Sequence, residues 1–118
     1  RIDLSERTGT RNPRLLDVIA AMESNLETPL TLNELAERAG LSLRQLERLF
    51  VAELSERPGR YYRDLRLRRA QHLVRQTGMS MMQVAVATGF SSATHFAKAY
   101  AALHGIAPSR DRAVRSGR

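Results

Sequence analysis

Four polar side chains in one short stretch could recognise a patterned set of hydrogen-bonding groups. Their positions lie one to four residues apart, so one helix presents them on adjoining parts of its surface, and they are Arg44, Gln45, Glu47 and Arg48. In the major groove of duplex DNA, arginine can pair with guanine, glutamine with adenine, and glutamate can accept from cytosine. The alternative is a solvated helix face, where a local ion pair contributes about a few tenths of a kcal/mol.

The element that carries these residues occurs twice in the chain. At an offset of 49, Thr31, Leu35, Ala36, Gly40 and Leu41 match Ser80, Val84, Ala85, Gly89 and Phe90. After one extra residue in the second turn, Ser42, Leu46, Arg48, Phe50 and Pro58 match Ser92, Phe96, Lys98, Tyr100 and Pro108. Such internal similarity exposes the architecture. Each copy has a small alanine four residues before a glycine, the pattern of a helix-turn-helix.

The second copy presents a different set of side chains at the matching positions. These are Ala93, Thr94, His95, Ala97 and Lys98. Because this set is smaller and less polar, we expect it to read thymine methyl groups and groove shape more than hydrogen-bond patterns.

Helix start and stop signals predict an all-α fold. Asn12–Pro13 begins a helix, and Thr31–Glu34, Ser42–Gln45 and Ser80–Gln83 are capping boxes, while Ser92 caps a further helix. We expect about seven helices, over 13–26, 32–39, 43–53, 58–76, 81–88, 93–104 and 108–115. The fold is predicted to be two helix-turn-helix subdomains joined by a long linker helix.

The expected organisation follows from these helices. Residues 1–11 read as a flexible tail or linker, 12–57 as the first subdomain, 58–77 as the linker helix, 78–112 as the second subdomain and 113–118 as a frayed end. Since the first residue is Arg1 rather than methionine, we expect a fragment of a longer protein or a processed chain.

Composition favours a polyanionic partner. The net charge is +7; residues 1–56 hold seven arginines against ten acidic residues, whereas residues 57–118 hold twelve basic residues against two acidic ones. Arginine supplies all but one of the basic residues, which suits phosphate and guanine contacts or equally reflects a GC-rich genome. The sequence has no cysteine and no apolar run of about 20 residues, so it offers neither thiol chemistry nor a membrane span.

An enzyme, metal or cofactor function has little support. The three histidines share no metal-ligand spacing, and His72 reads as a satisfied structural residue beside the apolar stripe of the linker helix. Asp64 and Asp111 read as isolated. The basic linker helix could also lie on a membrane surface or dock onto an acidic partner. Tyr61 and Tyr62 are expected to be core and boundary residues.

Several polar residues stand at predicted helix N-termini, where free amides and the helix dipole suit phosphate oxygens. We expect helix capping as their default role and phosphate contact as an added use. They are Thr31, Ser42, Ser80, Ser91 and Ser92.

Four stretches resemble the C-terminal DNA-binding domain of the AraC/XylS family of bacterial regulators. They are GLSLRQLERLF, RPGRYYRDLRLRRAQHLV, VAVATGFSSATHFAKAY and HGIAPSRDR, within about residues 13–112. The resemblance implies seven helices with a rigid linker, and two reading helices in successive major grooves on one face of bent DNA. It also places base contacts on Arg44, Gln45, Glu47, Arg48, Ala93, Thr94, His95, Ala97 and Lys98.

Two departures from the family pattern stand out. An aromatic residue often precedes the last arginine of the closing signature, where this chain has Asp111, a variant that looks like the branch with an amidotransferase-like sensor domain. Ala93 and Ala97 remove polar side chains from positions often used for bases.

The sequence therefore predicts a non-enzymatic domain that binds an asymmetric duplex site, with reading helices about 34 Å apart. The resemblance implies activation or repression of transcription, promoter DNA and RNA polymerase as partners, a cytoplasmic location at the nucleoid, no membrane, no cofactor, and an effector bound by a domain outside this chain. The alternative is a basic helical adaptor that docks on an acidic protein.

Overall fold

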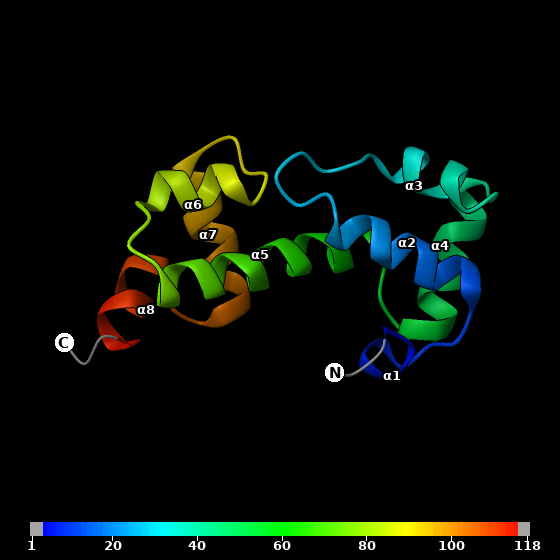
Figure 1. The fold of residues 1–118 in the computed structure, drawn as a ribbon, viewed down its shortest axis with the longest axis horizontal. Helices are drawn as coiled ribbons and strands as arrows, with labels where there is room; N and C mark the ends of the chain where they lie inside the picture. Colours follow the sequence, from blue (N-terminus) through cyan, green and yellow to red (C-terminus); the bar gives the residue numbers. More distant parts are fainter. Residues whose placement is uncertain (1–3, 116–118) are drawn as a thin grey trace. The chain divides into compact units, whose positions relative to one another are not determined.

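The computed structural model describes residues 4–115, and every regular element in that range is a helix (Figure 1). The eight helices are α1 (Leu4–Thr8), α2 (Pro13–Glu23), α3 (Leu32–Arg38), α4 (Leu43–Leu54), α5 (Pro58–Gln76), α6 (Met81–Ala87), α7 (Ala93–His104) and α8 (Pro108–Arg115). The prediction of an all-α fold is confirmed, and seven of the eight helices are the predicted ones.

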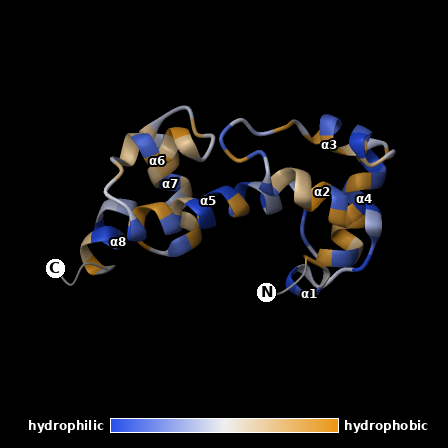
Figure 2. Cartoon of the chain, in the orientation of Figure 1, coloured by the Kyte–Doolittle hydropathy of each residue, from blue (hydrophilic) through white to orange (hydrophobic). Residues whose placement is uncertain are grey.

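The chain forms two compact units. Unit 1 comprises the described residues as far as Asn25 together with Pro29–Arg63, and unit 2 comprises Leu26–Thr28 and the residues from Asp64 onward. The division falls within α5, so that one helix supplies its N-terminal part to unit 1 and its C-terminal part to unit 2. Figure 2 shows α5 as largely hydrophilic, with hydrophobic residues at intervals along it.

Unit 1 is held by apolar faces of its helices and by one buried tyrosine. The buried side chains are Leu15, Val18, Ile19, Met22, Leu35, Ala36, Leu46, Phe50 and Tyr62. The Tyr62 hydroxyl donates to the carbonyl oxygen of Asn25 and accepts from the backbone N–H of Leu30 at 3.0 Å. Tyr62 therefore fastens the α2–α3 connection to α5, and its predicted role as a core residue is confirmed.

Unit 2 has its own core, built from α5, α6 and α7. Its buried residues are Leu67, Ala70, Leu73, Val74, Val84, Ala85, Phe90, Phe96 and Tyr100. Phe90, Phe96 and Tyr100 stack edge to face in succession, with ring centroids 5.5 and 5.7 Å apart.

The start of each core helix is fixed locally, as predicted. All three capping boxes are present: Thr31, Ser42 and Ser80 each accept from the N–H three residues on, and Glu34, Gln45 and Gln83 return the bond to the cap N–H at 2.8 to 2.9 Å. Asn12 caps α2, and Ser92 caps α7 by accepting from the N–H of His95.

The two helix-turn-helix turns close in the same way. Gly40 and Gly89 adopt positive φ angles of 71° and 81°. The residue after each glycine donates its N–H to the alanine carbonyl five residues earlier, at 2.9 Å for Leu41 and 2.8 Å for Phe90. Glycine adopts this left-handed conformation without the steric cost of a β-carbon. The matched turns set the direction in which α4 and α7 leave them.

The N-terminal segment differs from the expected flexible tail. Residues Leu4–Thr8 form α1, and Arg7 pairs with both carboxylate oxygens of Glu23 on α2, at 2.7 and 3.2 Å. The buried Thr10 hydroxyl donates to the Glu53 carboxylate on α4. A five-residue helix leaves almost no periodic pattern in sequence, and these long-range bonds hold it.

Candidate nucleic-acid interface

The first candidate face lies on α4, opposite its buried side. Leu46 and Phe50 are fully buried, whereas Arg44, Gln45 and Arg48 are exposed and Glu47 is half-buried. Within residues 4–115, neither Arg44, Glu47 nor Arg48 makes a hydrogen bond or ion pair. The local ion pair considered above is therefore absent, and the charged groups of this face are available to a ligand.

Gln45 differs from its neighbours because its side chain already has a partner. Its Oε1 accepts from the N–H of Ser42 at 2.9 Å to close the capping box. A two-point contact with adenine needs both the amide oxygen and the amide nitrogen. Gln45 could therefore read adenine in this way only by releasing the cap.

The second candidate face lies on α7. Phe96 and Tyr100 are fully buried, while the exposed side chains are Ala93, Thr94, His95 and Lys98, with Ala97 half-buried. Ala93, Ala97 and Lys98 line an open pocket that Met81 and Pro108 also border. The pocket lies beside the two alanines, and His95 is the one residue with an aromatic ring among the five candidate residues of this face.

The polar residues at the helix starts serve as caps in the structure. The hydroxyls of Thr31, Ser42, Ser80 and Ser92 each accept a backbone N–H of the first helical turn, and all four residues are exposed. Ser91, also exposed, precedes the cap of α7. Phosphate contact by these residues stays a prediction.

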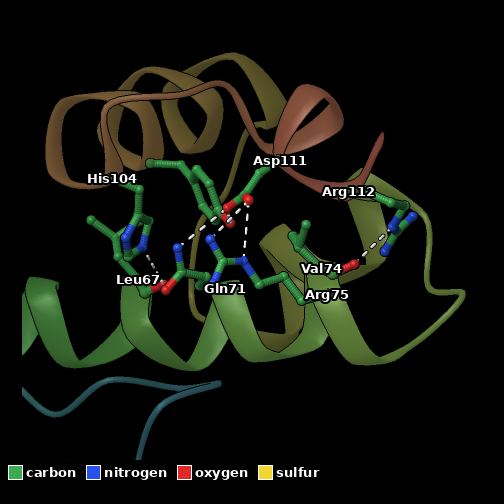
Figure 3. A network of polar contacts seen from close by, with 8 residues as sticks. Leu67, Gln71, Val74, Arg75, His104, Asp111 and Arg112 are labelled. Atoms are coloured by element: carbon green, nitrogen blue, oxygen red, sulfur yellow. Dashed lines mark hydrogen bonds and ion pairs between the residues drawn. The ribbon is translucent and has the colours of Figure 1, made fainter. Parts of the chain in front are cut away.

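A polar cluster fastens α7 and α8 to α5, and the sequence interpretation of Asp111 as isolated is wrong. Figure 3 shows Asp111 beside Gln71 and Arg75. Asp111 is only 2% exposed, and its carboxylate accepts from the Tyr100 hydroxyl at 2.6 Å, from Gln71 Nε2 at 3.2 Å and from Arg75 Nε at 3.1 Å. Arg75 also approaches it through Nη2 at 3.0 Å. We call these four residues the Asp111 cluster.

Two members of the Asp111 cluster, Asp111 and Tyr100, have shifted pKa values. Burial acts to raise the pKa of Asp111, but the hydrogen bonds from Tyr100, Arg75 and Gln71 outweigh it, so this pKa lies below the usual value for aspartate. Burial, reinforced by the hydrogen bond to Asp111 and its charge, raises the pKa of the Tyr100 hydroxyl. The cluster therefore holds a charged carboxylate against a neutral phenol.

Two further contacts join α7 and α8 to α5 (Figure 3). A ring nitrogen of His104 lies 3.0 Å from the carbonyl oxygen of Leu67, and Arg112 Nε donates to the carbonyl oxygen of Val74 at 2.9 Å. His72, by contrast, is exposed. The histidine with a backbone partner is thus His104, and the prediction for His72 is wrong because only the fold reveals which ring meets a backbone carbonyl.

Neither a metal centre nor a membrane span is found in the described part of the chain. No three histidine or acidic side chains between residues 4 and 115 gather in a way that could hold a metal ion. None of the helices in that range combines the length and apolar character needed to cross a bilayer.

Two matched turns, each leading into a helix with an exposed outer face, define a tandem helix-turn-helix protein. A family model described as a helix-turn-helix domain matches residues 35–113. A solved AraC-type DNA-binding domain protein from Chromobacterium violaceum is 43% identical, with a TM-score of 0.84, and the match covers 88% of this chain and 93% of that one. The chain belongs to the AraC/XylS family of DNA-binding domains, a family of transcription regulators rather than enzymes.

Other relatives place this domain within longer proteins. The HTH-type transcriptional regulator ArgR of Pseudomonas aeruginosa is 43% identical over 117 residues, 99% of this chain and 36% of ArgR. The regulator CdhR of the same species is 46% identical over 97% of this chain and 34% of CdhR. The chain thus spans about a third of the length of these curated relatives.

The DNA-binding domain of AdpA, solved with a target DNA, is 27% identical with a TM-score of 0.84, over 91% of this chain and 97% of that one.

Proposed function

We propose that the chain is the promoter-binding part of a bacterial AraC-type regulator, and that α4 and α7 enter successive major grooves of one asymmetric site. The observation that carries this proposal is the α4 face, where two arginines and a glutamate have no partner in the described chain while the opposite face is buried. An α-helix fits the major groove, and such side chains match its hydrogen-bonding pattern.

The two faces would read DNA by different chemistry. On α4, Arg44 and Arg48 supply donors and Glu47 supplies an acceptor. Gln45 contributes through its amide nitrogen, because its Oε1 is engaged in the cap. On α7, Ala93 and Ala97 border a hollow of a kind that suits thymine methyl groups, beside Thr94, His95 and Lys98. The exposed caps Thr31, Ser42, Ser80 and Ser92, with Ser91, lie where phosphates would approach helix N-termini.

The wider role of the protein rests on its relatives. ArgR and CdhR are transcriptional regulators about three times as long as this chain. We therefore place effector sensing in a domain outside the chain, and regulation of transcription with RNA polymerase at the nucleoid in the cytoplasm. We assign the sensing domain to the amidotransferase-like type because Asp111 stands where the family often has an aromatic residue.

The first test is selection of bound fragments from genomic DNA at near-physiological salt, followed by footprinting. One protected stretch of about two helical turns with a shared motif is expected. Protection of one half alone would overturn the two-groove arrangement. No enrichment over random fragments would leave only salt-sensitive, non-specific binding and would favour the adaptor alternative.

A matched pair of variants tests the α4 face. Arg48→Ala should lower affinity by about 1–3 kcal/mol and relax the preference at one base position. Arg38→Ala removes the same charge from an exposed site on α3 and should leave the base preferences intact. An Arg48→Ala protein with unchanged preferences would remove Arg48 from the reading residues.

A further inference from the structure

The duplication places two different side chains at the third position of the two reading helices. Gln45 in α4 and His95 in α7 are matched at the offset of 50. Gln45 returns a hydrogen bond to its cap residue, whereas α7 has no such return bond and His95 is exposed. The same position thus serves helix capping in unit 1 and leaves an imidazole at the surface in unit 2.

The His95 ring packs against Phe90, which in turn packs against Arg66. The edge-to-face contact of its ring with Phe90 has a centroid distance of 5.6 Å and an interplanar angle of 69°. Phe90 is 4% exposed, and the guanidinium carbon of Arg66 lies 4.5 Å from its ring centroid. Arg66 Nη1 also donates to the carbonyl oxygen of Gly89, at 3.4 Å, in the turn that leads to α7. We call Arg66, Phe90 and His95 the α7 column.

Unit 1 has no equivalent of this column. The residue matched to Phe90 is Leu41, which has no ring to accept a cation or to orient a neighbour. The α7 column is therefore a feature of the second unit alone, at the first turn of its reading helix.

We propose that Arg66 is a positioning residue for base recognition: through Phe90 it fixes the His95 imidazole, which donates a hydrogen bond to the N7 acceptor of a purine. This inference rests on the proposed function. A neutral imidazole carries one N–H donor, and both purines present N7 in the major groove. A ring held in place before DNA arrives loses less freedom on binding than a free one.

The other side chains of the α7 face lack a donor that is both planar and held in one orientation. Ala93 and Ala97 have no hydrogen-bonding group, and the Lys98 ammonium is a strongly hydrated point charge on a flexible stem. Thr94 bears a short hydroxyl. His95 is the one planar, oriented donor among them, so a purine preference in the second half-site should trace to it.

The experiment compares base preferences by selection from randomised duplexes, then by binding titrations with single-base variants of the chosen site. His95→Ala should reduce the preference for a purine over a pyrimidine at one base position by about 3- to 10-fold. Arg66→Met, which keeps the stem but removes the planar cation, should weaken the same preference and add nothing in the His95→Ala background. Arg69→Met, at an exposed site of α5, controls for the lost charge and should change no preference.

Two more variants separate recognition from folding. His95→Glu supplies an acceptor of the kind that closes the capping box of α3, so it should keep or raise the melting temperature, and because a carboxylate has no N–H to donate it should lose the purine preference. Phe90→Leu copies Leu41 of unit 1 and should lose the same preference, which keeps the test decisive if Arg66→Met does not fold.

Each contrary outcome has a clear meaning. Should His95→Ala weaken all sequences by one factor, His95 contacts phosphate and the inference fails. If Arg66→Met and Phe90→Leu lower the affinity for all sequences by the same factor, the α7 column only stabilises the fold, and the inference is overturned. Wild-type protein without any sequence preference would overturn the proposed function itself, and the inference with it.

Discussion

Replacing Asp111 by alanine should destabilise unit 2, because a buried carboxylate is the common acceptor for donors on α5 and α7. Without it the buried Tyr100 hydroxyl and the half-buried Gln71 amide lose their acceptor, and Arg75 loses its ion pair. Tyr100 is fully buried, so its hydroxyl has no route to water without local opening.

The magnitude follows from how much of the Asp111 cluster is buried. Removing one partner of a buried ion pair costs about 3–5 kcal/mol, but the Arg75 side chain is 40% exposed and can turn to water, so we expect about 2–3 kcal/mol. Tyr100→Phe removes only one bond to the carboxylate and should cost about 1.5 kcal/mol. The order, Asp111→Ala above Tyr100→Phe, is part of the prediction.

The assay is urea unfolding followed by circular dichroism, with hydrogen exchange to locate the loss in α7 and α8. Since the folded-state pKa of Asp111 is depressed, its stabilisation is complete above the unfolded-state value of about 3.9 and is lost as pH falls below it. The gap between wild type and Asp111→Ala should therefore be full at pH 7 and narrow below about pH 4. A gap under about 1 kcal/mol at pH 7, or one unchanged at pH 3, would refute the reasoning.

Three further substitutions test the local supports of unit 1, each by urea unfolding. Ser42→Ala removes the α4 cap and should cost about 1 kcal/mol, with faster hydrogen exchange in the first turn of α4; unchanged exchange there would count against the cap. Tyr62→Phe takes the acceptor from the Leu30 N–H and should cost about 1–2 kcal/mol, and a neutral effect would show that water replaces the hydroxyl. Gly40→Ala meets no atom within 4 Å, so only its φ of 71° opposes it, at about 1 kcal/mol; a cost several times larger would mean that the turn itself rearranges.

The features predicted correctly from sequence are those fixed by residues close together in the chain. The capping boxes at Thr31, Ser42 and Ser80 each join residues three apart, and the turn glycines act on their own backbone. The duplication strengthened these predictions because each signal occurs twice. Helix α5 was predicted from Pro58 to Gln76, the range observed.

The features missed depend on contacts between distant residues. Nothing near Asp111 in sequence shows that Gln71 and Arg75 will meet it, since those side chains lie 40 and 36 residues away. His104 meets Leu67 across 37 residues, α1 is joined to Glu23 through Arg7, and Thr10, two residues after α1, reaches Glu53. For the site, the exposure of the α4 and α7 faces follows from periodicity, but the engagement of Gln45 in its cap and the α7 column required coordinates.

The sharing of α5 between the two units bears on how the chain acquires its structure during synthesis. Unit 1 ends at Arg63, so its residues have all been synthesised while most of unit 2 is still untranslated. At about 5–20 residues per second, the N-terminal unit has seconds in which to pack. Starting a helix is the unfavourable step, with a nucleation constant of about 10⁻³, whereas extending one is close to neutral. Asp64–Gln76 can therefore grow from a turn that unit 1 has already ordered, and the second core assembles on a helix that it did not have to nucleate.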